Sequence, residues 1–337
     1  MSAPSDELPG RTRRPVHGGR LAVSLLVVLA AAVVLLPDLL GLDRRSPFAQ
    51  AVSFRPALLA GLAVLAVVAT VAAGARRRGW TLAGGLLAVA LAASLLVLPR
   101  AVAAWEVPEP DRPSGRPLTV LAVNTFEGEA DVEAVAALVR SGRPDLIALT
   151  ESAGRFRDRL APLLPDYRFA ASQDGGEDVH AVTAAAHADL GEVAVQVDRS
   201  TTFPSVELTG GGLGDLRFVA FHSVAPTRED LQNWRKDLTS LDRWCANRAI
   251  GPAIVAGDFN ATLDHSVFRE AITGCADAAE RTGEGLVATW PSWAPRWLGP
   301  QIDHVLVTGG ITAEVLSVHD IPGSDHRAVL TRLRLPA

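Results

Sequence analysis

The apolar residues of this chain are concentrated in three long runs near its start, at residues 21–36, 57–75 and 80–98. About 20 apolar residues span a hydrocarbon core of roughly 30 Å, so the pattern predicts three transmembrane helices. The alternative for the first run is a cleaved signal peptide, because four arginines precede it. No small-residue cleavage pattern closes that run and two further runs follow it, which favours a membrane span.

Beyond residue 105 the pattern changes to short β-branched runs that alternate with longer helical patterns. The predicted strands are 118–123, 145–149, 216–221, 253–256, 302–307 and 328–333, and the predicted helices are 131–140 and 228–247. The stretch EVPEPDRPSGRP is too rich in Pro to hold a helix. The pattern therefore divides the chain into a tail (1–20), a three-helix transmembrane region (21–105), a linker (106–117) and a mixed α/β domain (118–337).

Composition supports this division. The chain has 337 residues, of which 48% are hydrophobic, and this share is high for a wholly soluble protein. The first 105 residues hold 11 Arg and four acidic residues, whereas the rest hold 21 basic and 33 acidic residues. The net charges of the two parts are thus +7 and −12, so the two parts are physically different.

The arginines also predict an orientation in the membrane. A cytoplasmic N-terminus places seven arginines on the inner side, whereas the first outer loop then holds three, Arg44, Arg45 and Arg55. The inner seven are Arg11, Arg13, Arg14, Arg20, Arg76, Arg77 and Arg78. Cytoplasmic loops carry an excess of basic residues, so we expect a multi-pass protein of the cell membrane with an extracytoplasmic α/β domain. Arg100, Arg112 and Arg116 lie just beyond the third run and weaken this bias.

Residues that bind metals or move protons stand where several predicted strands begin or end. They are Asn124, Glu151, His222, Asp258, Asn260, Asp303, Asp325 and His326. Taken alone, these residues have ordinary alternatives. Glu151 could be a solvated loop residue, the Asp-Phe-Asn stretch an Asx turn or helix cap, the Ser-Asp-His stretch a strand cap, and His222 a structural histidine. A buried strand delivers a polar group at its end to the rim of a sheet. The recurrence of such endings favours one site at that rim.

The combination of GDFN at 257–260, IDH at 302–304 and SDH at 324–326 resembles the endonuclease/exonuclease/phosphatase superfamily. Its members include pancreatic-type deoxyribonucleases, abasic-site endonucleases, neutral sphingomyelinases and inositol-polyphosphate phosphatases. The resemblance covers residues 118–335. It implies a four-layer α/β sandwich, in which two mixed sheets pack face to face with helices outside. It also implies a metal-dependent hydrolase of phosphoric ester bonds with its site at one rim.

The resemblance assigns three residues to the metal region. Glu151 matches the principal Mg²⁺ ligand of the family, with Asn124 close by, and Asp325 matches a further carboxylate. Mg²⁺ takes oxygen ligands and keeps several waters, so one or two carboxylates and the phosphate oxygens of the substrate suffice. Mn²⁺ is the alternative ion.

The resemblance assigns catalytic roles to four more residues. Asp258 matches the residue that positions or deprotonates the attacking water, and Asn260 matches its partner that holds the phosphate and the nucleophile in line. His326 matches the imidazole that contacts the scissile phosphate. Asp303 matches the carboxylate that fixes the tautomer of that imidazole and favours its charged form.

His222 indicates a branch of the family. The sphingomyelinase and deoxyribonuclease branches use a His at this strand end to protonate the leaving oxygen, whereas the abasic-site branch uses a nearby Tyr. The chain has a single Tyr, Tyr167, so the arrangement with His fits better. The implied mechanism is in-line attack of water on a phosphodiester or phosphomonoester, with metal and imidazoles neutralising the developing charge.

Two departures from the family pattern affect this interpretation. Phe126 stands where a second carboxylate is often found, so metal binding depends more on Glu151 and Asp325. The Ser-Arg pair that many members carry after the Glu region is missing, and His180 lies in that stretch. His180 is either a substitute contact or an ordinary surface residue.

The charge of the domain bears on its substrate. Nucleases gain affinity by neutralising phosphates with Lys and Arg, yet residues 106–337 have a net charge of −12 and one Lys, Lys236. Extended nucleic acid is therefore a poor fit as a substrate, and we expect an ester of a lipid headgroup or a small metabolite, with the bilayer as a partner.

Three tryptophans lie just before Asp303. Trp290, Trp293 and Trp297 suit a lipid–water interface, and packing at the domain edge is the alternative. An extracytoplasmic nuclease is the second hypothesis and a non-catalytic binding module the third. No protein partner follows from the sequence.

The two cysteines, Cys245 and Cys275, bear on the compartment. An oxidising environment allows them to pair, so an extracytoplasmic domain predicts a disulfide between them. Two buried free thiols are the alternative.

Overall fold

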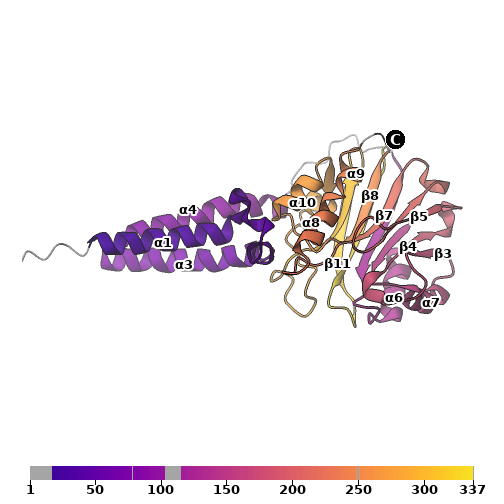
Figure 1. The fold of residues 1–337 in the computed structure, drawn as a ribbon, viewed down its shortest axis with the longest axis horizontal. Coiled ribbons are helices and arrows are strands. Elements are labelled where there is room, and N and C mark those ends of the chain that lie inside the picture. The colour runs from indigo at the N-terminus through magenta and orange to yellow at the C-terminus, as the bar shows by residue number, and fades with distance from the viewer. Residues whose placement is uncertain (1–16, 78, 103–114, 248, 250, 337) are drawn as a thin grey trace, which may run out of the picture.

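The computed structural model describes residues 17–77, 79–102, 115–247, 249 and 251–336. Over these residues the chain forms an elongated bundle of helices joined at one end to an α/β sandwich (Figure 1). Residues 1–16 of the predicted tail, with Arg11, Arg13 and Arg14, lie outside the described residues, as do Arg78 and residues 106–114 of the predicted linker.

The three predicted spans form three long helices, α1 (His17–Leu35), α3 (Arg55–Arg76) and α4 (Trp80–Val97). By length and composition, all three are suited to crossing a membrane. Leucines and valines cover much of their outer surface, and small residues such as Ala66 and Ala93 are buried between them. Helices that are apolar all round are typical of membrane spans. Pro37, which has no amide hydrogen to continue a helix, follows the end of α1.

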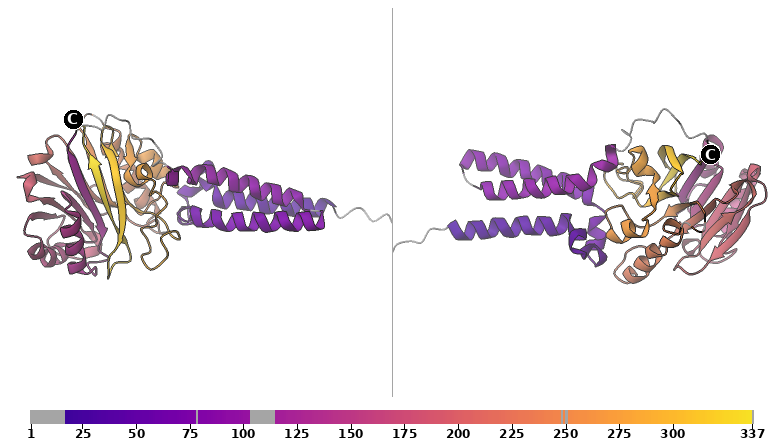
Figure 2. Two further views of the ribbon diagram at one scale, coloured as in Figure 1. Left: turned by 180° about the vertical axis from the view of Figure 1, so that it is seen from behind. Right: turned by 90° about the horizontal axis from the view of Figure 1, so that it is seen from above.

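Short elements at one end of the bundle connect it to the sandwich (Figure 2). Between α1 and α3 the chain forms η1 (Pro37–Leu40), η2 (Leu42–Arg44) and α2 (Phe48–Val52). After α4 it forms α5 (Pro99–Val102). The predicted transmembrane region therefore contains a segment that packs against the α/β domain.

The sandwich contains two six-stranded sheets among the described residues. The first has the order β11-β12-β1-β2-β4-β3 and the second has the order β5-β6-β7-β8-β10-β9. β1 pairs in parallel with β2, and β7 with β8, whereas the other pairs are antiparallel. The strands are β1 (Pro117–Asn124), β2 (Leu146–Thr150), β3 (Tyr167–Ala171), β4 (Val182–His187), β5 (Ala194–Asp198), β6 (Ser205–Thr209), β7 (Arg217–His222), β8 (Ala253–Asp258), β9 (Cys275–Asp277), β10 (Asp303–Thr308), β11 (Thr312–Asp320) and β12 (Arg327–Arg334).

Helices cover the outer faces of both sheets. α6 (Val132–Gly142) and α7 (Gly154–Leu160) pack on the first sheet, and α8 (Leu231–Thr239), α9 (Asp242–Cys245) and α10 (Ser266–Ala271) pack on the second. A third apolar cluster lies between the sheets and includes Val120, Phe218 and Ile254. The predicted four-layer sandwich is therefore confirmed, and burial on both faces explains why central strands read as continuous apolar runs. The remaining elements are α11 (Ala278–Thr282), η4 (Ala161–Leu163), η5 (Asp178–His180), η6 (Ala188–Leu190) and η7 (Gly211–Leu213).

One predicted helix differs from the structure. Residues 228–247 form two helices, α8 and α9, with a turn at Ser240 and Leu241. The Ser240 hydroxyl donates to the carbonyl of Asp237 at 2.6 Å, and such bonds compete with helix continuation. Leu241 is buried in the core on the outer face of the second sheet. At the end of α9, Cys245 forms a disulfide with Cys275 of β9.

Candidate active site

The topology brings the predicted polar residues to one rim of the sandwich. In the second sheet, Asp258 lies at the end of β8. Its partners on the two neighbouring strands are His222 of β7 and Asp303 of β10. In the first sheet Asn124 is paired with Thr150, which directly precedes Glu151. Parallel strands end at the same edge, whereas an antiparallel neighbour begins there, so the ends of β1, β2, β7 and β8 meet the starts of β10 and β12.

Asn124 links the two sheets at this rim. Its Nδ2 donates to Oε1 of Glu151 and to Oδ2 of Asp258, both at 3.0 Å. Its Oδ1 accepts a hydrogen bond from the backbone N–H of Phe126 at 2.9 Å. The second oxygen of Glu151, Oε2, accepts from the N–H of Glu127 at 2.8 Å. Asn124 therefore holds two carboxylates next to each other with its amide nitrogen.

The GDFN stretch is folded so that Asp258 and Asn260 face the same point. The Asn260 N–H donates to Oδ1 of Asp258 at 2.8 Å, and Nδ2 of Asn260 donates to the Ser223 carbonyl at 2.9 Å. Gly257 has a φ of 144°, and a Cβ there would lie 2.0 Å from the Phe221 carbonyl oxygen. The glycine is therefore required for the close approach of β7 and β8 beside the site.

Asp303 and His326 form a buried ion pair. Oδ2 of Asp303 lies 2.9 Å from Nδ1 of His326, and Nε2 of His326 lies 3.7 Å from Oδ2 of Asp258. Ser324 orients this part of the rim, because its hydroxyl accepts from the His326 N–H at 3.0 Å and donates to the Asn124 carbonyl at 2.8 Å.

Burial and charge set the protonation of the site. Burial raises the pKa of Asp258 to about 7; the charged His326 opposes this shift and the Asp303 carboxylate adds to it. Burial alone would lower the pKa of His326, but the carboxylates of Asp303 and Asp258 outweigh it and raise that pKa to about 10. Burial also raises the pKa of Glu151, against the hydrogen bond from Asn124. The site therefore holds a charged imidazole beside a carboxylate that titrates near neutral pH.

His222 is the second imidazole at the centre of the site. Its Nε2 lies 3.7 Å from Oδ2 of Asp258, and the ring of Phe203 packs on it with centroids 4.6 Å apart. Burial lowers the pKa of His222 to about 3, and the charge of His326 adds to the shift. His222 is therefore neutral while His326 is charged. His180, which is exposed, contacts Phe203 at 5.5 Å between centroids and so lies at the edge of the site.

In the described part of the chain, two groups of three His, Asp or Glu side chains have possible metal-ligand atoms within 4.8 Å of one another. One comprises Glu151, His222 and Asp258, and the other Asp258, Asp303 and His326. The first fits a divalent cation, because it brings the half-buried carboxylate of Glu151 and the buried carboxylate of Asp258 together with the neutral imidazole of His222. Carboxylate oxygens suit Mg²⁺ or Mn²⁺. In the second group, the charged His326 is not available as a ligand.

Asp325 lies at the border of these groups. Its Oδ2 accepts a hydrogen bond from Nε1 of Trp290 at 3.0 Å, and its Oδ1 lies 3.9 Å from Nε2 of His326. Oδ1 is buried and has no hydrogen-bond partner among the described residues. The structure therefore places Asp325 next to the predicted site but outside the two ligand groups.

Backbone strain is concentrated at this rim. Phe126, Glu127, Glu151 and Asn260 are four of the six non-glycine residues with positive φ in the described part of the chain. Such conformations cost on the order of 1–3 kcal/mol each and persist where surrounding contacts enforce them. Phe203, Ser324 and Thr289, whose Oγ1 accepts from the Asp303 N–H at 3.1 Å, also support the site. None of these three was predicted as a site residue, although Ser324 is the first residue of the SDH motif at 324–326.

The sequence profile described as the Endonuclease/Exonuclease/phosphatase family matches residues 121–326, which is more than half of the chain. The chain therefore belongs to the endonuclease/exonuclease/phosphatase family, whose members are hydrolases that act on phosphoester bonds. No curated protein sequence matches it.

Solved structures share the fold. Humanized TDP2 from D. rerio has a TM-score of 0.53 and 15% sequence identity, over 65% of this chain and 99% of that one. An endonuclease/exonuclease/phosphatase from Bacteroides vulgatus has a TM-score of 0.51 and 17% identity over the same shares. D. rerio TDP2 complexed with a single-strand DNA product has a TM-score of 0.50 and 14% identity, again over 65% and 99%. At these identities the likeness shows the fold alone.

Proposed function

We propose that this chain is a membrane-anchored, Mg²⁺-dependent phosphoesterase that hydrolyses a phosphodiester or phosphomonoester of a lipid headgroup or a small metabolite. The observation that carries the proposal is the environment of Asp258. One buried carboxylate contacts Asn124 and Asn260 by hydrogen bonds and lies 3.7 Å from each of two imidazoles, those of His222 and His326. A carboxylate whose pKa is about 7 is suited to general base catalysis near neutral pH.

Each residue at the rim has a distinct part in this hydrolysis. Asp258 accepts a proton from the attacking water, whose oxygen forms the new bond to phosphorus, and Asn260 aligns the water with the phosphate. As the ester P–O bond breaks, the charged His326 donates a proton to the leaving oxygen, and Asp303 keeps that imidazole charged and oriented. The resemblance assigns protonation of the leaving oxygen to His222, but burial lowers the pKa of His222 to about 3, so we assign that role to the charged His326 instead. The neutral His222 lies at the same centre, 3.7 Å from Oδ2 of Asp258.

The metal enters this scheme as a source of positive charge. Glu151 would hold a divalent cation, with Asn124 and Asp325 in the same region, and the bound ion would neutralise charge on the phosphate oxygens. Mg²⁺ fits the carboxylate donors, and Mn²⁺ is the alternative.

Two features support anchoring with the domain outside the cytoplasm. Three of the arginines that the predicted orientation places on the outer side pair with acidic residues of the sandwich: Arg44 with Glu270, and Arg55 and Arg100 with Asp264. Because acidic residues neutralise these outer arginines, they count less in the comparison with the arginines at the cytoplasmic end of the bundle, and the predicted orientation is strengthened. The disulfide between Cys245 and Cys275 supports an oxidising compartment.

The second candidate is an extracytoplasmic nuclease. It is favoured by one observation, that a protein of the same fold, D. rerio TDP2, is described in complex with a single-strand DNA product. The net charge of −12 over residues 106–337 counts against it, because nucleic-acid binding depends on neutralising phosphates. Phe126, exposed beside Glu151, favours a substrate with an apolar part.

A substrate panel separates the two candidates. The purified full chain in vesicles would be assayed with Mg²⁺ for release of phosphate or headgroup from phospholipids, and for cleavage of single-stranded and plasmid DNA. We expect lipid ester hydrolysis to exceed DNA cleavage. Mg²⁺-dependent DNA cleavage that is lost in Asp258→Ala, with no activity on any lipid, would establish the nuclease instead.

A further inference from the structure

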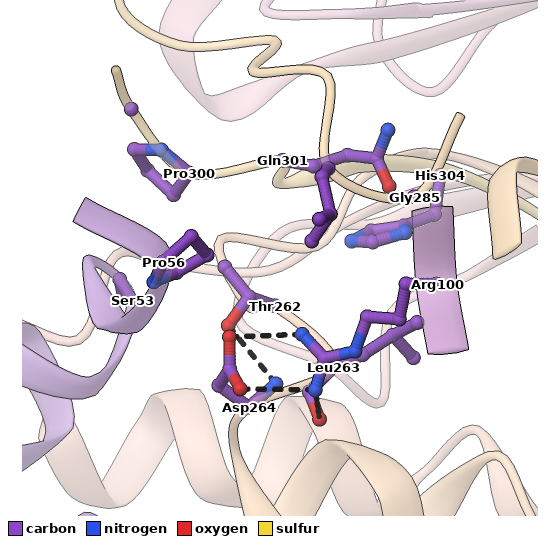
Figure 3. A pocket seen from close by; sticks show the side chains of 12 residues that line it. Ser53, Pro56, Arg100, Thr262, Leu263, Asp264, Gly285, Pro300, Gln301 and His304 are labelled. Atoms are coloured by element: carbon purple, nitrogen blue, oxygen red, sulfur yellow. Dashed lines mark hydrogen bonds and ion pairs between the residues drawn. The ribbon is translucent and has the colours of Figure 1, made fainter. Parts of the chain in front are cut away.

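The sandwich is fixed to the helix ends by buried ion pairs. Asp264, six residues after Asp258, receives a hydrogen bond from Arg55 at the start of α3 at 2.8 Å. It also receives two hydrogen bonds from Arg100, after α4, both at 2.9 Å (Figure 3). All three side chains are buried. A buried charge pair tolerates little displacement, because a separated partner would be left uncompensated.

Further contacts surround this cluster. The Ser266 N–H donates to Oδ2 of Asp43 at 2.6 Å, Arg269 pairs with Asp38 at 2.8 Å, and Nε2 of His265 lies 2.8 Å from the Ala49 carbonyl oxygen. We call these contacts between residues 38–100 and residues 263–270 the junction. The junction holds the sandwich in one orientation relative to the helices, and therefore relative to any bilayer that the helices cross.

Residues 285–300, which precede β10, contact the junction at both ends of the segment. Gly285 lies so close to Arg100 that a Cβ on it would stand 3.1 Å from the Arg100 Cβ. Leu286 packs against the apolar cluster of the helix bundle, and Pro300 lines a small cavity with Pro56 and Arg100 (Figure 3). Figures 1 and 2 show this gold segment on the side of the sandwich that faces the helices.

The middle of this segment exposes apolar side chains. Trp293 is 83% exposed, Trp297 71% and Leu298 40%. Among the described residues from 115 to 336, six large apolar side chains are exposed, and three of them lie between positions 293 and 298. Trp side chains combine a large apolar ring with a polar N–H and are enriched at the membrane interface.

The polypeptide around these side chains is held in place by the active-site rim. The Ser292 N–H donates to the Asp325 carbonyl at 2.7 Å, and Arg327 donates to the carbonyls of Ser292 and Ala294 at 2.6 and 2.5 Å. Trp290 donates to the Asp325 carboxylate. Because Asp325 precedes His326, a surface that contacts residues 293–298 lies next to the catalytic rim.

We propose that Trp293, Trp297 and Leu298 contact the headgroup layer of the bilayer that anchors the chain, and so keep the catalytic rim at the lipid surface. This proposal rests on the membrane anchoring stated under Proposed function. It specifies the partner of this surface as a lipid bilayer, and it makes esters at the bilayer surface the substrates that the site meets first.

Depth-dependent quenching tests the contact without reference to activity. Because both native cysteines form the disulfide, Trp293→Cys adds one thiol for a nitrobenzoxadiazole label. The full chain would be reconstituted in phosphatidylcholine vesicles that contain lipid spin-labelled near the headgroup. The control is Val195→Cys, which is half exposed on β5, far from the helices (Figure 1). We expect quenching at position 293 to be several-fold greater than at position 195. Equal, weak quenching at both positions in protein that floats with the vesicles would overturn the proposal.

A second measurement separates this contact from the proposed activity. The variant with Trp293→Ser and Trp297→Ser should lose most hydrolysis of a vesicle-borne phosphoester while retaining hydrolysis of the soluble bis(p-nitrophenyl) phosphate. Equal retention of both activities would contradict a membrane role for these residues. If the wild type hydrolyses neither substrate, the proposed function fails, and the quenching result still decides the contact.

Two further outcomes concern the bilayer itself. Failure of the wild type to float with vesicles would contradict the anchoring and therefore this proposal as well. Quenching that requires a second protein in the membrane would identify a protein partner and overturn the lipid assignment.

Discussion

Oδ2 of Asp303 lies 2.9 Å from Nδ1 of His326, and both side chains are buried at the rim where β10 and β12 begin. This pairing fixes the orientation of the imidazole and leaves Nε2 3.7 Å from Oδ2 of Asp258. It also explains how an imidazole removed from water keeps its positive charge, because the nearby carboxylates outweigh the effect of burial and raise the pKa of His326 to about 10.

Replacing Asp303 with Asn should move the alkaline limit of activity. The scheme requires a charged His326, so the rate should fall as pH rises through the pKa of that residue. Loss of the Asp303 charge lowers this pKa, and Asp303→Asn should therefore lose activity at lower pH than the wild type, with a reduced maximum rate. pH–rate profiles of the two proteins measure this. An unchanged alkaline limb would contradict the charge assignment.

The metal requirement should depend on Glu151. Glu151→Gln preserves the size of the side chain but removes its negative charge, so half-maximal activity should need a higher Mg²⁺ concentration. Glu133, which is exposed on α6 and pairs with Arg140 of the same helix, provides a matched control as Glu133→Gln. Titration of activity with Mg²⁺ in both variants tests this. Identical Mg²⁺ dependence in Glu151→Gln and the wild type would remove Glu151 from the metal site.

Much of this arrangement was predictable because the strands that carry the site are buried on both faces. Their apolar runs are unbroken and end at a polar residue, as in β1 at Asn124 and β8 at Asp258. The edge strands β5 and β3 were not predicted, because they are only partly buried and their sequences carry little apolar patterning. Local sequence also gave no sign of contacts that depend on tertiary packing, such as Phe203 on His222.

The junction shows the same limit. Arg55 and Arg100 were interpreted from sequence only as charges that bear on membrane orientation. In the structure they meet Asp264, more than 160 positions along the chain, and form a buried cluster. Sequence separation of this size leaves no local pattern, so the contact could only be found in three dimensions.

The junction predicts how the domain behaves when the linker is cut. Proteolysis between residues 106 and 117 in intact cells, after outer layers are removed, should leave the wild-type sandwich bound to the membrane fraction. Asp264→Arg places a third positive charge between Arg55 and Arg100, so the cut domain should be released. Separation of membranes and supernatant after cleavage measures this. Release of the wild-type domain at the same rate would show that the junction does not hold it.

The disulfide should be present in the protein isolated from its natural compartment. Thiol labelling of unreduced, denatured protein should therefore modify neither Cys245 nor Cys275, and reduction should expose both. The bridge closes a loop with a sequence separation of 30. Removing such a cross-link costs about 3–4 kcal/mol in the chain-entropy model, so Cys275→Ser should lower the midpoint of thermal unfolding. Two reactive thiols before reduction would contradict both the bridge and the extracytoplasmic assignment.

The most direct test of the account is phosphoester hydrolysis by the full chain in vesicles, measured with Mg²⁺ and with chelator, for the wild type and for Asp258→Asn. Removal of a general base costs on the order of 10² to 10⁴ in rate. We therefore expect Mg²⁺-dependent hydrolysis by the wild type and a loss of that size in Asp258→Asn, with an unchanged thermal unfolding midpoint. Hydrolysis by a correctly folded Asp258→Asn at the wild-type rate, or wild-type activity that persists in chelator, would contradict a metal-dependent site centred on Asp258.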